Sequence, residues 1–565
     1  MDGILEVLSQ KLTDNQKHGD CFERYSQLKT DQERVTFTLN LLIDYNITFS
    51  VKSEVKNVFQ SRDFNAKATK LLINNPLNCD FDIIIELYTK SIAYAPGSRE
   101  LSLAYANRSA TLFKARLYED CLCDCERALK LNYPDKWKAK LFARKARCLS
   151  YLADVNGSSD PKVAEALEQV RLWLPKMDGK ESGVKLVEKT LNSLHLMSQS
   201  EAAFVKLDDK RHLPSIIVDN EEICGATSAL AVEFSEQYGK HVRATRDIKV
   251  GEVLSVNEGY ATVLMLDKTY THCAHCLKQT WSAIPCNFCI YALFCGEDCR
   301  REAWEGYHEV ECRVTGPMVA MEMNHMALMA LRLLVSVVKQ AGDLQALKDL
   351  LTEIDSLTDL RTNGFTDGKL DGSKYASVYT LARNTERRSV PDLFGRSLNA
   401  AYITYLLATE SSMLGEQLKG GLTEVSSHPW ATFVGGLIMR HLQIIPSNVH
   451  SVTEDNLDQL PIDRAAALMP LYSLFNHSCN PMVDRRSFGK KIAMIAISPI
   501  KKGEQIFDNY GQHYAITLKA KRRQKLLQQY HFTCSCQACT ESWPLYGSYK
   551  SYKVYEIFIV EIIIK

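Results

Sequence analysis

Cys273-Ala-His-Cys276 opens the stretch of sequence that decides the fold, which continues with Cys286-Asn-Phe-Cys289, Cys295-Gly-Glu-Asp-Cys299 and His308-Glu-Val-Glu-Cys312. Structural zinc takes four thiolate or imidazole ligands, and short Cys-x2-Cys loops present two sulfur atoms at a suitable separation. Eight such residues in one short segment predict two complete tetrahedral zinc sites. Ordinary buried cysteines, the alternative, do not explain this spacing.

A second cluster lies near the C-terminus. Cys534, Cys536 and Cys539 follow one another closely, and Cys479 stands upstream in Asn476-His-Ser-Cys479. These four cysteines complete a third set of ligands, so we expect three structural zinc ions with no ligand left over. Because the eight ligands of the first stretch are all used in closed sites, that stretch has no open coordination position for catalysis. It is expected to be structural or a peptide-docking surface.

Composition excludes several classes of protein. The remaining cysteines are scattered and form no disulfide framework, the N-terminus lacks the features of a signal peptide, and no apolar run reaches membrane-spanning length. We therefore expect a reducing compartment, cytoplasm or nucleus, and no membrane association. A net charge of +1 on 565 residues gives no support for nucleic-acid binding. The chain is long enough for several domains and is expected to be a monomer.

Amphipathic helices with punctuation near a 34-residue spacing are predicted over residues 60–195, after an N-terminal helical segment, 1–59. Small residues at Ser109, Cys121 and Ala128 stand where paired helices approach closely. This pattern resembles the tetratricopeptide (TPR) repeat, whose helix pairs form a concave groove that binds a peptide.

Some TPR domains grip the acidic C-terminal tails of cytosolic chaperones. Asn107, Lys140 and Arg144 match that carboxylate clamp, as does Asn65 on the first inner helix, whereas Ser61 stands where the clamp has a lysine. Two cations and two amides that face one groove can hold a terminal carboxylate by charge-assisted hydrogen bonds. The alternative is that Lys140 and Arg144 form the solvated face of a basic helix.

The cysteine-rich stretch, residues 273–312, resembles the MYND zinc finger over its whole length. In that family the ligand pairs interleave. The resemblance implies that Cys273, Cys276, Cys295 and Cys299 bind one ion and that Cys286, Cys289, His308 and Cys312 bind the other. The free energy of metal binding then supplies the folding free energy of this small segment.

Further motifs surround the finger in a fixed order. Tyr238-Gly-Lys-His precedes it, and Asn476-His-Ser-Cys-Asn-Pro481, Asp508-Asn-Tyr-Gly511 and Phe532-Thr-Cys-Ser-Cys536 follow. Together they resemble the SET fold, and the whole order resembles the SET and MYND domain family of protein-lysine methyltransferases, in particular its TPR-bearing branch. The expected fold is α+β and multidomain. The expected boundaries are 213–265 for the first SET segment, 273–312 for the finger, 313–455 for a helical insert with one helix over Met318–Val338, 456–531 for the SET core, 532–540 for a post-SET zinc loop and 541–565 for an atypical apolar tail.

The resemblance implies S-adenosylmethionine as methyl donor and a lysine of a protein as acceptor. Main chain at Gly239 and Lys240 would cradle the cofactor, Asn448, Asn476 and His477 would bind it, and Phe532 would stack on its adenine. Tyr510 would be the catalytic tyrosine, beside the methyl group and the incoming amine. Cys479 would tie the post-SET loop to the cofactor-binding motif.

Two positions depart from the family pattern. His241 stands where a second glycine is usual, and Met482 stands where asparagine is usual. These departures and the tail keep a second hypothesis open, a non-catalytic adaptor whose TPR and MYND modules recruit chaperones or transcriptional co-repressors. DNA binding through the finger ranks third, because the chain lacks a basic stripe.

Overall fold

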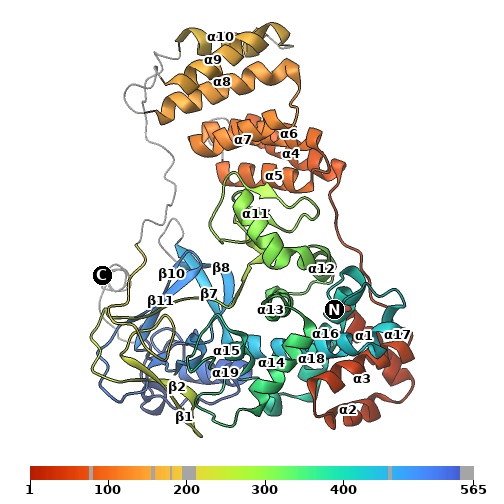
Figure 1. Ribbon diagram of the computed structural model, residues 1–565, viewed down its shortest axis with the longest axis vertical. Coiled ribbons are helices and arrows are strands. Elements are labelled where there is room, and N and C mark those ends of the chain that lie inside the picture. The colour runs from red at the N-terminus through yellow and green to blue at the C-terminus, as the bar shows by residue number, and fades with distance from the viewer. Residues whose placement is uncertain (75–79, 154–159, 178–180, 194–211, 456–460, 547–565) are drawn as a thin grey trace.

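The computed structural model describes residues 1–74, 80–153, 160–177, 181–193, 212–455 and 461–546. The molecule is elongated, with an arm of helices at one end and a broader body at the other (Figure 1). The finger lies between them, and the body combines small β-sheets on one side with a block of helices on the other. The predicted α+β multidomain fold is confirmed. Most of the expected apolar tail, residues 547–565, lies outside the described residues.

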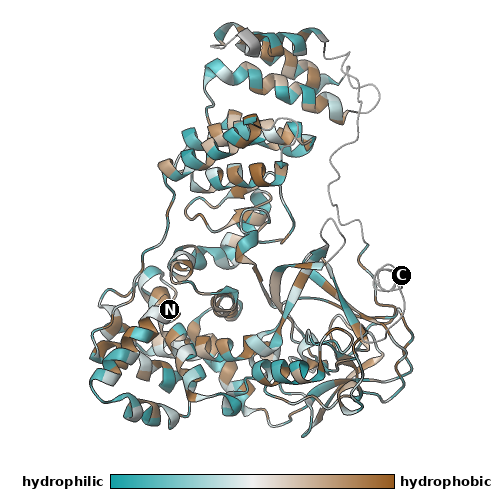
Figure 2. Ribbon diagram, turned by 180° about the vertical axis from the view of Figure 1, so that it is seen from behind, coloured by the Kyte–Doolittle hydropathy of each residue, from teal (hydrophilic) through white to brown (hydrophobic). Residues whose placement is uncertain are grey.

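The arm consists of helices that pack antiparallel to their neighbours. Figure 2 shows hydrophilic and hydrophobic residues interspersed along them, as amphipathic helices require. Ser109, Cys121 and Ala128 are fully buried, and the Cys121 thiol donates to the carbonyl of Ser109 at 3.2 Å. The small residues therefore lie where helices meet, while the assignment to the TPR family stays a prediction. The helices of the arm are α4 (Val58–Asn74), α5 (Phe81–Tyr94), α6 (Ser98–Lys114), α7 (Tyr118–Lys130), α8 (Asp135–Leu152), α9 (Pro161–Trp173) and α10 (Glu181–Ser193).

Hydrogen bonds from buried side chains of the arm join it to the finger. The Arg108 guanidinium donates to both carboxylate oxygens of Asp124, at 2.7 and 2.9 Å, and both side chains are fully buried. The same guanidinium donates to the carbonyl of Ala283 in the finger at 2.8 Å, and the Ser282 hydroxyl donates to Asp120 at 2.8 Å. The ion pair itself lies within the arm, between α6 and α7, and it holds the guanidinium where it reaches the finger. The network therefore holds the arm against the finger in one orientation.

The finger is built from two short strands and a helical segment. Its hairpin packs on α5, where Ala93 and Tyr94 contact Ala283, Ile290 and Leu293. One face of the finger is thus covered by the arm. Its elements are β5 (Ile284–Pro285), β6 (Leu293–Phe294), α11 (Glu297–Ala303), a π-helical turn (Trp304–His308) and α12 (Glu309–Ala320).

Strands from before and after the finger form common sheets. Strand β3 pairs with β11 in the sheet β10-β11-β3, β4 pairs with β8 in the sheet β4-β8-β7, and β9 pairs in parallel with β12. The two halves of the SET region are therefore one folded unit, split by the finger and the helical insert. The strands are β1 (Leu230–Ser235), β2 (Gly239–Ala244), β3 (Val253–Glu258), β4 (Ala261–Leu264), β7 (Val449–Asp455), β8 (Pro461–Leu468), β9 (Asn476–His477), β10 (Val483–Phe488), β11 (Lys491–Ala496) and β12 (Phe507–Asp508).

The helical insert differs from the expectation in two respects. Strand β7 pairs with β8 and so belongs to the SET sheets, which places the end of the insert at Asn448 and not at residue 455. The single helix expected over Met318–Val338 is two helices, because Glu322 adopts a left-handed φ of 55° and Asn324 caps a new helix. The helices are α13 (His325–Ala341), α14 (Leu344–Ser356), α15 (Tyr375–Tyr379), α16 (Val390–Glu410), α17 (Gly421–Ser427) and α18 (Pro429–Asn448), with α19 (Lys519–Tyr530) and α20 (Gln537–Thr540) following the SET core.

The N-terminal segment contributes α1 (Asp2–Asp14), α2 (His18–Ser26) and α3 (Asp31–Asp44), which share one hydrophobic core with the insert. Helix α3 lies against α18 at two glycines. A Cβ at Gly435 would stand 2.8 Å from Val35, and one at Gly436 would stand 3.1 Å from the main chain of Gln32. The missing side chains therefore allow α3 to pack this closely. Among the described helices, none has both the length and the apolar character needed to cross a membrane.

Candidate metal centres and cofactor site

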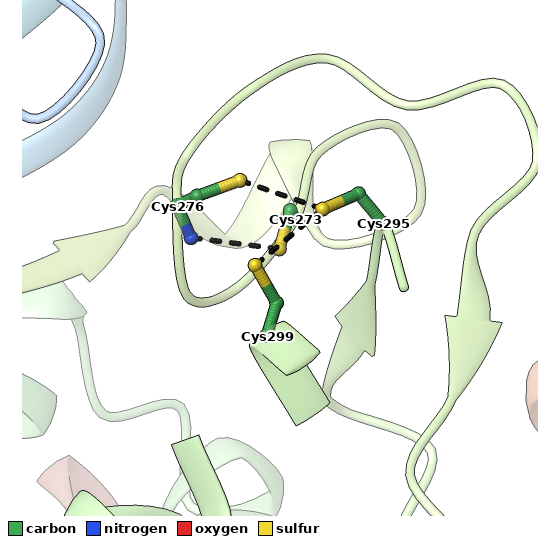
Figure 3. Close-up of side chains that lie close together, drawn as sticks. All are labelled: Cys273, Cys276, Cys295 and Cys299. Carbon is green, nitrogen blue, oxygen red and sulfur yellow. Dashed lines mark hydrogen bonds between the residues drawn. The ribbon is translucent and has the colours of Figure 1, made fainter. Parts of the chain in front are cut away.

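The structure brings the twelve expected metal ligands together in three groups of four. Within each group the ligand atoms all lie within 4.8 Å of one another, and Figure 3 shows one of the groups. The interleaved arrangement that the family resemblance implied is the arrangement found. The groups are Cys273, Cys276, Cys295 and Cys299; Cys286, Cys289, His308 and Cys312; and Cys479, Cys534, Cys536 and Cys539.

The spacing of the ligand atoms fits tetrahedral zinc. Zinc–sulfur bonds of about 2.3 Å place two sulfur atoms roughly 3.8 Å apart. The sulfur atoms of Cys276 and Cys295 are 3.7 Å apart, and those of Cys479 and Cys539 are 3.6 Å apart. Thiolate and imidazole donors in closed sets of four are the ligands of structural zinc, so the residues present fit this ion.

Arg522 on α19 lies beside the third group, a position that the sequence pattern did not indicate. Its fully buried guanidinium donates to the sulfur of Cys479 at 3.1 Å and to that of Cys539 at 3.5 Å. Four thiolates around one divalent ion leave a net negative charge, which the guanidinium offsets. In the sequence Arg522 falls in a basic run, 519–525, that has the pattern of a solvated helix face.

The expected catalytic tyrosine, Tyr510, lies directly against the Asn476–His477 motif. The parallel pairing of β9 with β12 sets Asp508 opposite His477, and the chain then turns Tyr510 onto the imidazole ring, with ring centres 5.2 Å apart. The Tyr510 hydroxyl donates to the carbonyl of Phe475 at 2.9 Å. Burial raises the pKa of Tyr510 well above its ordinary value, so the hydroxyl stays protonated and is a hydrogen-bond donor.

The His477 imidazole links this tyrosine to the third metal group. Its Nδ1 accepts a hydrogen bond from the main-chain N–H of Tyr510 at 3.0 Å, and its Nε2 lies 3.4 Å from the sulfur of Cys479. Burial lowers the pKa of His477 to about 4, so the ring is neutral near pH 7. Because both ring nitrogens face protein atoms, a contact of His477 with a cofactor would use its main chain.

The turn before β2 approaches the same motif. The Asn476 side chain reaches toward the carbonyl of Tyr238 at 3.4 Å, and Gly239 adopts a left-handed φ of 64° that favours glycine. Apart from its two chain neighbours, no described residue has an atom within 4 Å of the position that a Gly239 Cβ would take, so among the described residues the turn has open space beside it. His241, where a second glycine was expected, folds back so that its Nδ1 lies 3.0 Å from the Gly239 carbonyl.

Lys240 and Asn448 both contact the segment of residues 379–388, which we call the support loop. The Lys240 ammonium donates to the carbonyl of Asn363 at 2.6 Å and to the Thr380 hydroxyl at 3.2 Å. The buried Asn448 amide donates to the carbonyl of Ala382 at 3.1 Å. These two expected cofactor residues are therefore anchored to one loop.

Phe532 follows His531 at the end of α19, and its ring centre lies 6.1 Å from that of His477. It packs with the ligands of the third metal group in one apolar cluster. Met482, the other departure from the family pattern, donates its main-chain N–H to Phe507 at 2.9 Å and packs at the edge of the SET core. The expected site residues thus surround one region of the body, although their roles stay predictions.

Arg485 and Asp508 form an ion pair near Tyr510 that the sequence did not indicate. The Arg485 Nε lies 3.2 Å from a carboxylate oxygen of Asp508, and a terminal nitrogen of Arg485 lies 2.6 Å from Nδ1 of His450. Asp508 is 3% exposed, and this burial raises the pKa of its carboxyl group. The pair ties β10, β12 and β7 together beneath the tyrosine.

In the arm, the four expected clamp residues line one cavity of about 490 Å³. The Asn107 amide donates to the Asn65 side chain at 2.9 Å, and the Arg144 guanidinium donates to the carbonyl of Ala106 at 2.9 Å. Lys140 also lines the cavity and makes no hydrogen bond or ion pair with a described residue in the structure. Ser61, which stands where the clamp has a lysine, is buried and donates to the carbonyl of Ser91. It therefore supplies no positive charge to the cavity.

Comparison with known proteins agrees with this geometry. The SET domain family model matches residues 239–511, from the start of β2 to the residue after Tyr510. Protein-lysine N-methyltransferase SMYD4 from Pongo abelii is 28% identical over 523 residues, and the human SMYD4 protein is 28% identical over 534 residues. Each match covers 80% of this chain and 64% of the relative.

A shorter match reaches the N-lysine methyltransferase SMYD2 from Homo sapiens, 25% identical over 302 residues, which cover 54% of this chain and 58% of that protein. The resemblance to the SET and MYND domain proteins is thereby confirmed. The chain spans 64% of the length of the SMYD4 relatives that it matches.

Replacing a ligand of the third group should remove one metal ion. In Cys536→Ser we expect the zinc content, measured by plasma mass spectrometry, to fall from three ions to two per chain, because three thiolates make a much weaker site. Cys123→Ser, at an exposed cysteine outside the three groups, is the matched control and should retain all three ions. Equal zinc contents in both variants would contradict the assignment.

Lys240 should give a specific pH dependence of stability. Burial lowers its pKa from 10.5 to about 8, so between these values the unfolded chain binds more protons than the folded one. Stability from this group therefore rises as pH increases from about 8 to 10.5. In urea unfolding, the free energy of unfolding of the native chain minus that of Lys240→Met should increase over this range. A difference that is constant with pH would show that Lys240 titrates normally.

Proposed function

We propose that the protein transfers a methyl group from S-adenosylmethionine to the side-chain amine of a lysine in a protein substrate. The supporting observation is that Tyr510, the Asn476–His477 motif, the Gly239 turn and Phe532 meet around one region of a SET domain. The SMYD4 and SMYD2 relatives are named as lysine methyltransferases, which supports the same reaction class.

The residues of the site suit a reaction that depends on positioning. The cofactor, when bound, supplies an electrophilic methyl group on sulfur. Tyr510 is held at three points, by its hydroxyl, its main-chain N–H and its ring. Its neutral hydroxyl can orient the lone pair of the acceptor amine or the polarised methyl group of the cofactor. Burial of the acceptor lysine would lower its pKa and favour the neutral amine that attacks.

The main alternative, an adaptor without catalysis, needs the finger and the groove as docking surfaces. The hairpin face of the finger is covered by α5, which disfavours recruitment of a transcriptional co-repressor through that face. Retention of Tyr510, Asn476, His477 and Phe532 also favours the enzyme. Because zinc thiolates and unpaired buried cysteines suit a reducing environment, we further propose action in the cytoplasm or nucleus.

Calorimetry on zinc-replete protein should test the enzyme hypothesis directly. We expect S-adenosylmethionine to bind, Asn476→Ala and Phe532→Ala to bind it at least tenfold more weakly, as lost cofactor contacts would require, and Tyr510→Phe to bind it normally. The rate of methyl transfer to lysine-containing proteins of an extract, measured with radiolabelled cofactor, should nevertheless fall by about a hundredfold or more in Tyr510→Phe.

Tyr546→Phe, at an exposed tyrosine, is the matched control, and this variant should transfer methyl groups normally. Absence of cofactor binding in folded protein that carries three zinc ions would overturn the enzyme hypothesis and favour the adaptor.

A second function, at the arm, is capture of an acidic peptide with a free C-terminal carboxylate, such as the tails of cytosolic chaperones. The supporting observation is that Asn65, Asn107, Lys140 and Arg144 line one cavity. The Arg62–Glu100 ion pair at 3.1 Å lies in the same lining, so one acidic side chain competes for the cations there.

Lys140→Ala should weaken binding of a fluorescent acidic peptide with a free C-terminus by about tenfold, as expected for loss of one charge-assisted hydrogen bond. Lys145→Ala, on the same helix but paired with Glu126, is the control and should bind as the native chain does. Fluorescence polarisation with the C-terminally amidated peptide gives a second check, since amidation should reduce affinity to the same extent. Equal affinities for both peptides would rule out the clamp.

A further inference from the structure

Asp31, at the start of α3, lies far in sequence from the SET domain but accepts hydrogen bonds from two elements of the helical insert. Its Oδ1 accepts from the amide of Gln443 on α18 at 2.9 Å, and its Oδ2 accepts from Arg383 of the support loop at 3.1 Å. Arg34 donates to Oδ1 at 3.0 Å from the same helix. The carboxylate is only 8% exposed and lies between two guanidinium groups.

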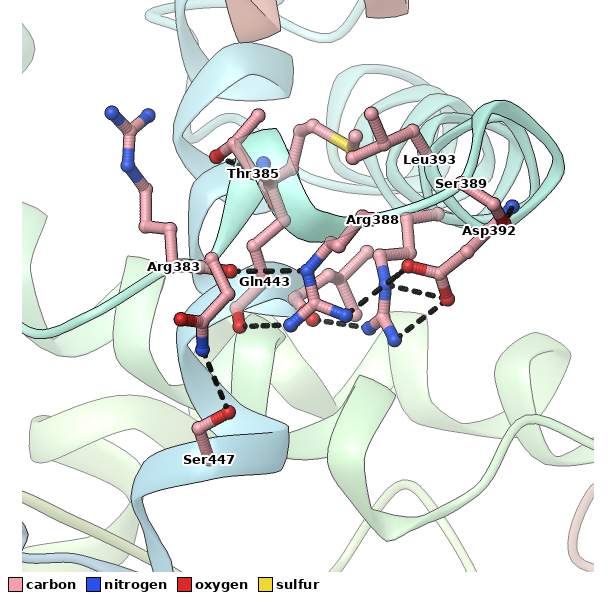
Figure 4. A network of polar contacts seen from close by, with 12 residues as sticks. Arg383, Thr385, Arg388, Ser389, Asp392, Leu393, Gln443 and Ser447 are labelled. Atoms are coloured by element: carbon pink, nitrogen blue, oxygen red, sulfur yellow. Dashed lines mark hydrogen bonds and ion pairs between the residues drawn. The ribbon is translucent and has the colours of Figure 1, made fainter. Parts of the chain in front are cut away.

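The contacts continue from Gln443 into the support loop, as Figure 4 shows for Gln443 and Arg388. The Thr385 hydroxyl donates to Oε1 of the fully buried Gln443 at 2.7 Å, and Arg388 donates to the main-chain carbonyl of Gln443 at 2.9 Å. Asn384 adopts a left-handed φ of 57°, a conformation that is uncommon for a residue other than glycine. The loop holds only one short 3-10 turn, Thr385–Arg387, so it needs side-chain partners to hold its conformation, and Asp31 and Gln443 provide them.

The same loop contacts the candidate cofactor site at three places. Thr380 accepts from Lys240, the carbonyl of Ala382 accepts from Asn448, and Arg387 donates to the carbonyl of His531 at 3.2 Å, one residue before Phe532. A displacement of the loop would therefore shift Lys240 and Asn448, which the family resemblance assigns to the cofactor, and the residue that precedes Phe532.

We propose that Asp31 is a positioning residue for the cofactor site, which makes the N-terminal helices part of the catalytic body. It acts through Arg383 and Gln443 and touches neither cofactor nor substrate. The cofactor part of this inference rests on the proposed function, whereas the effect on the loop does not. Loss of the negative charge leaves Arg34 and Arg383 as neighbouring cations without the carboxylate between them, and the loop should then move away from α3.

Hydrogen exchange of the whole 565-residue chain, without cofactor, tests the effect on the loop. Asp31→Asn and Arg383→Gln should each increase amide exchange across residues 379–388, including the N–H groups of Arg387 and Arg388, which donate within the loop. Asp20→Asn, at an exposed carboxylate on α2 that pairs with Arg24, is the matched control and should leave the loop unchanged. Unchanged exchange in both loop variants would overturn the inference. Because Arg383 is 38% exposed, its variant should fold even if Asp31→Asn does not.

Calorimetry with S-adenosylmethionine then tests the link to the cofactor. Each variant should bind about tenfold more weakly than the native protein, with zinc content unchanged, because a small displacement of ligand-holding groups is costly. The double variant should bind no more weakly than Asp31→Asn alone, since Arg383→Gln removes a contact that Asp31→Asn has already weakened. Additive losses, or a looser loop with native affinity, would overturn the positioning role. If the native protein binds no cofactor, the proposed function fails, and the exchange result still decides whether Asp31 holds the loop.

Discussion

Tetrahedral coordination by four side chains is the constraint on which the rest of this structure depends. Most ligands of the two groups in the finger lie in one small core together with Ile284, Phe294 and Ala303. Zinc bound there would add its binding free energy to the folding of this short segment. The arm meets the finger where Arg108 donates to the carbonyl of Ala283, and α12 leads from the last ligand of the finger into the body. If the finger did not fold, the arm and the body would lose the element that joins them.

The third group of ligands applies the same constraint within the body. Cys479 follows the Asn476–His477 motif, while its three partners follow α19, so one ion would close a long loop of the chain. His477 would extend this closure to Tyr510, because its two ring nitrogens face Cys479 and the main chain of Tyr510. A zinc ion in this group would help to hold Tyr510 in place through one imidazole ring, and its four protein ligands would leave no open coordination position.

Much of the site could be predicted because its information is local in sequence. Metal ligands appear as short pairs with fixed spacing, and the Asn476–His477 and Tyr510 motifs keep their order. Other features depend on contacts between distant segments and could not be predicted. Asp31 meets Gln443 across some four hundred residues, and nothing near either position signals this. Arg522 stands in a basic run whose pattern is that of an exposed helix, yet it is fully buried against thiolates. Strand β7, likewise, has no strong alternation of its own and is defined by its partner β8.

The position of the N-terminal helices changes how the body should be divided into domains. Residues before the arm and residues after the finger share one hydrophobic core, in which α3 packs against α16 and α18, and the close approach at Gly435 and Gly436 leaves no room for solvent. The arm is therefore an insertion between α3 and β1, and not an N-terminal domain followed by a separate catalytic one. A fragment that began at the SET strands would expose the apolar surfaces of α16 and α18 that α3 covers, and it would lack the carboxylate of Asp31.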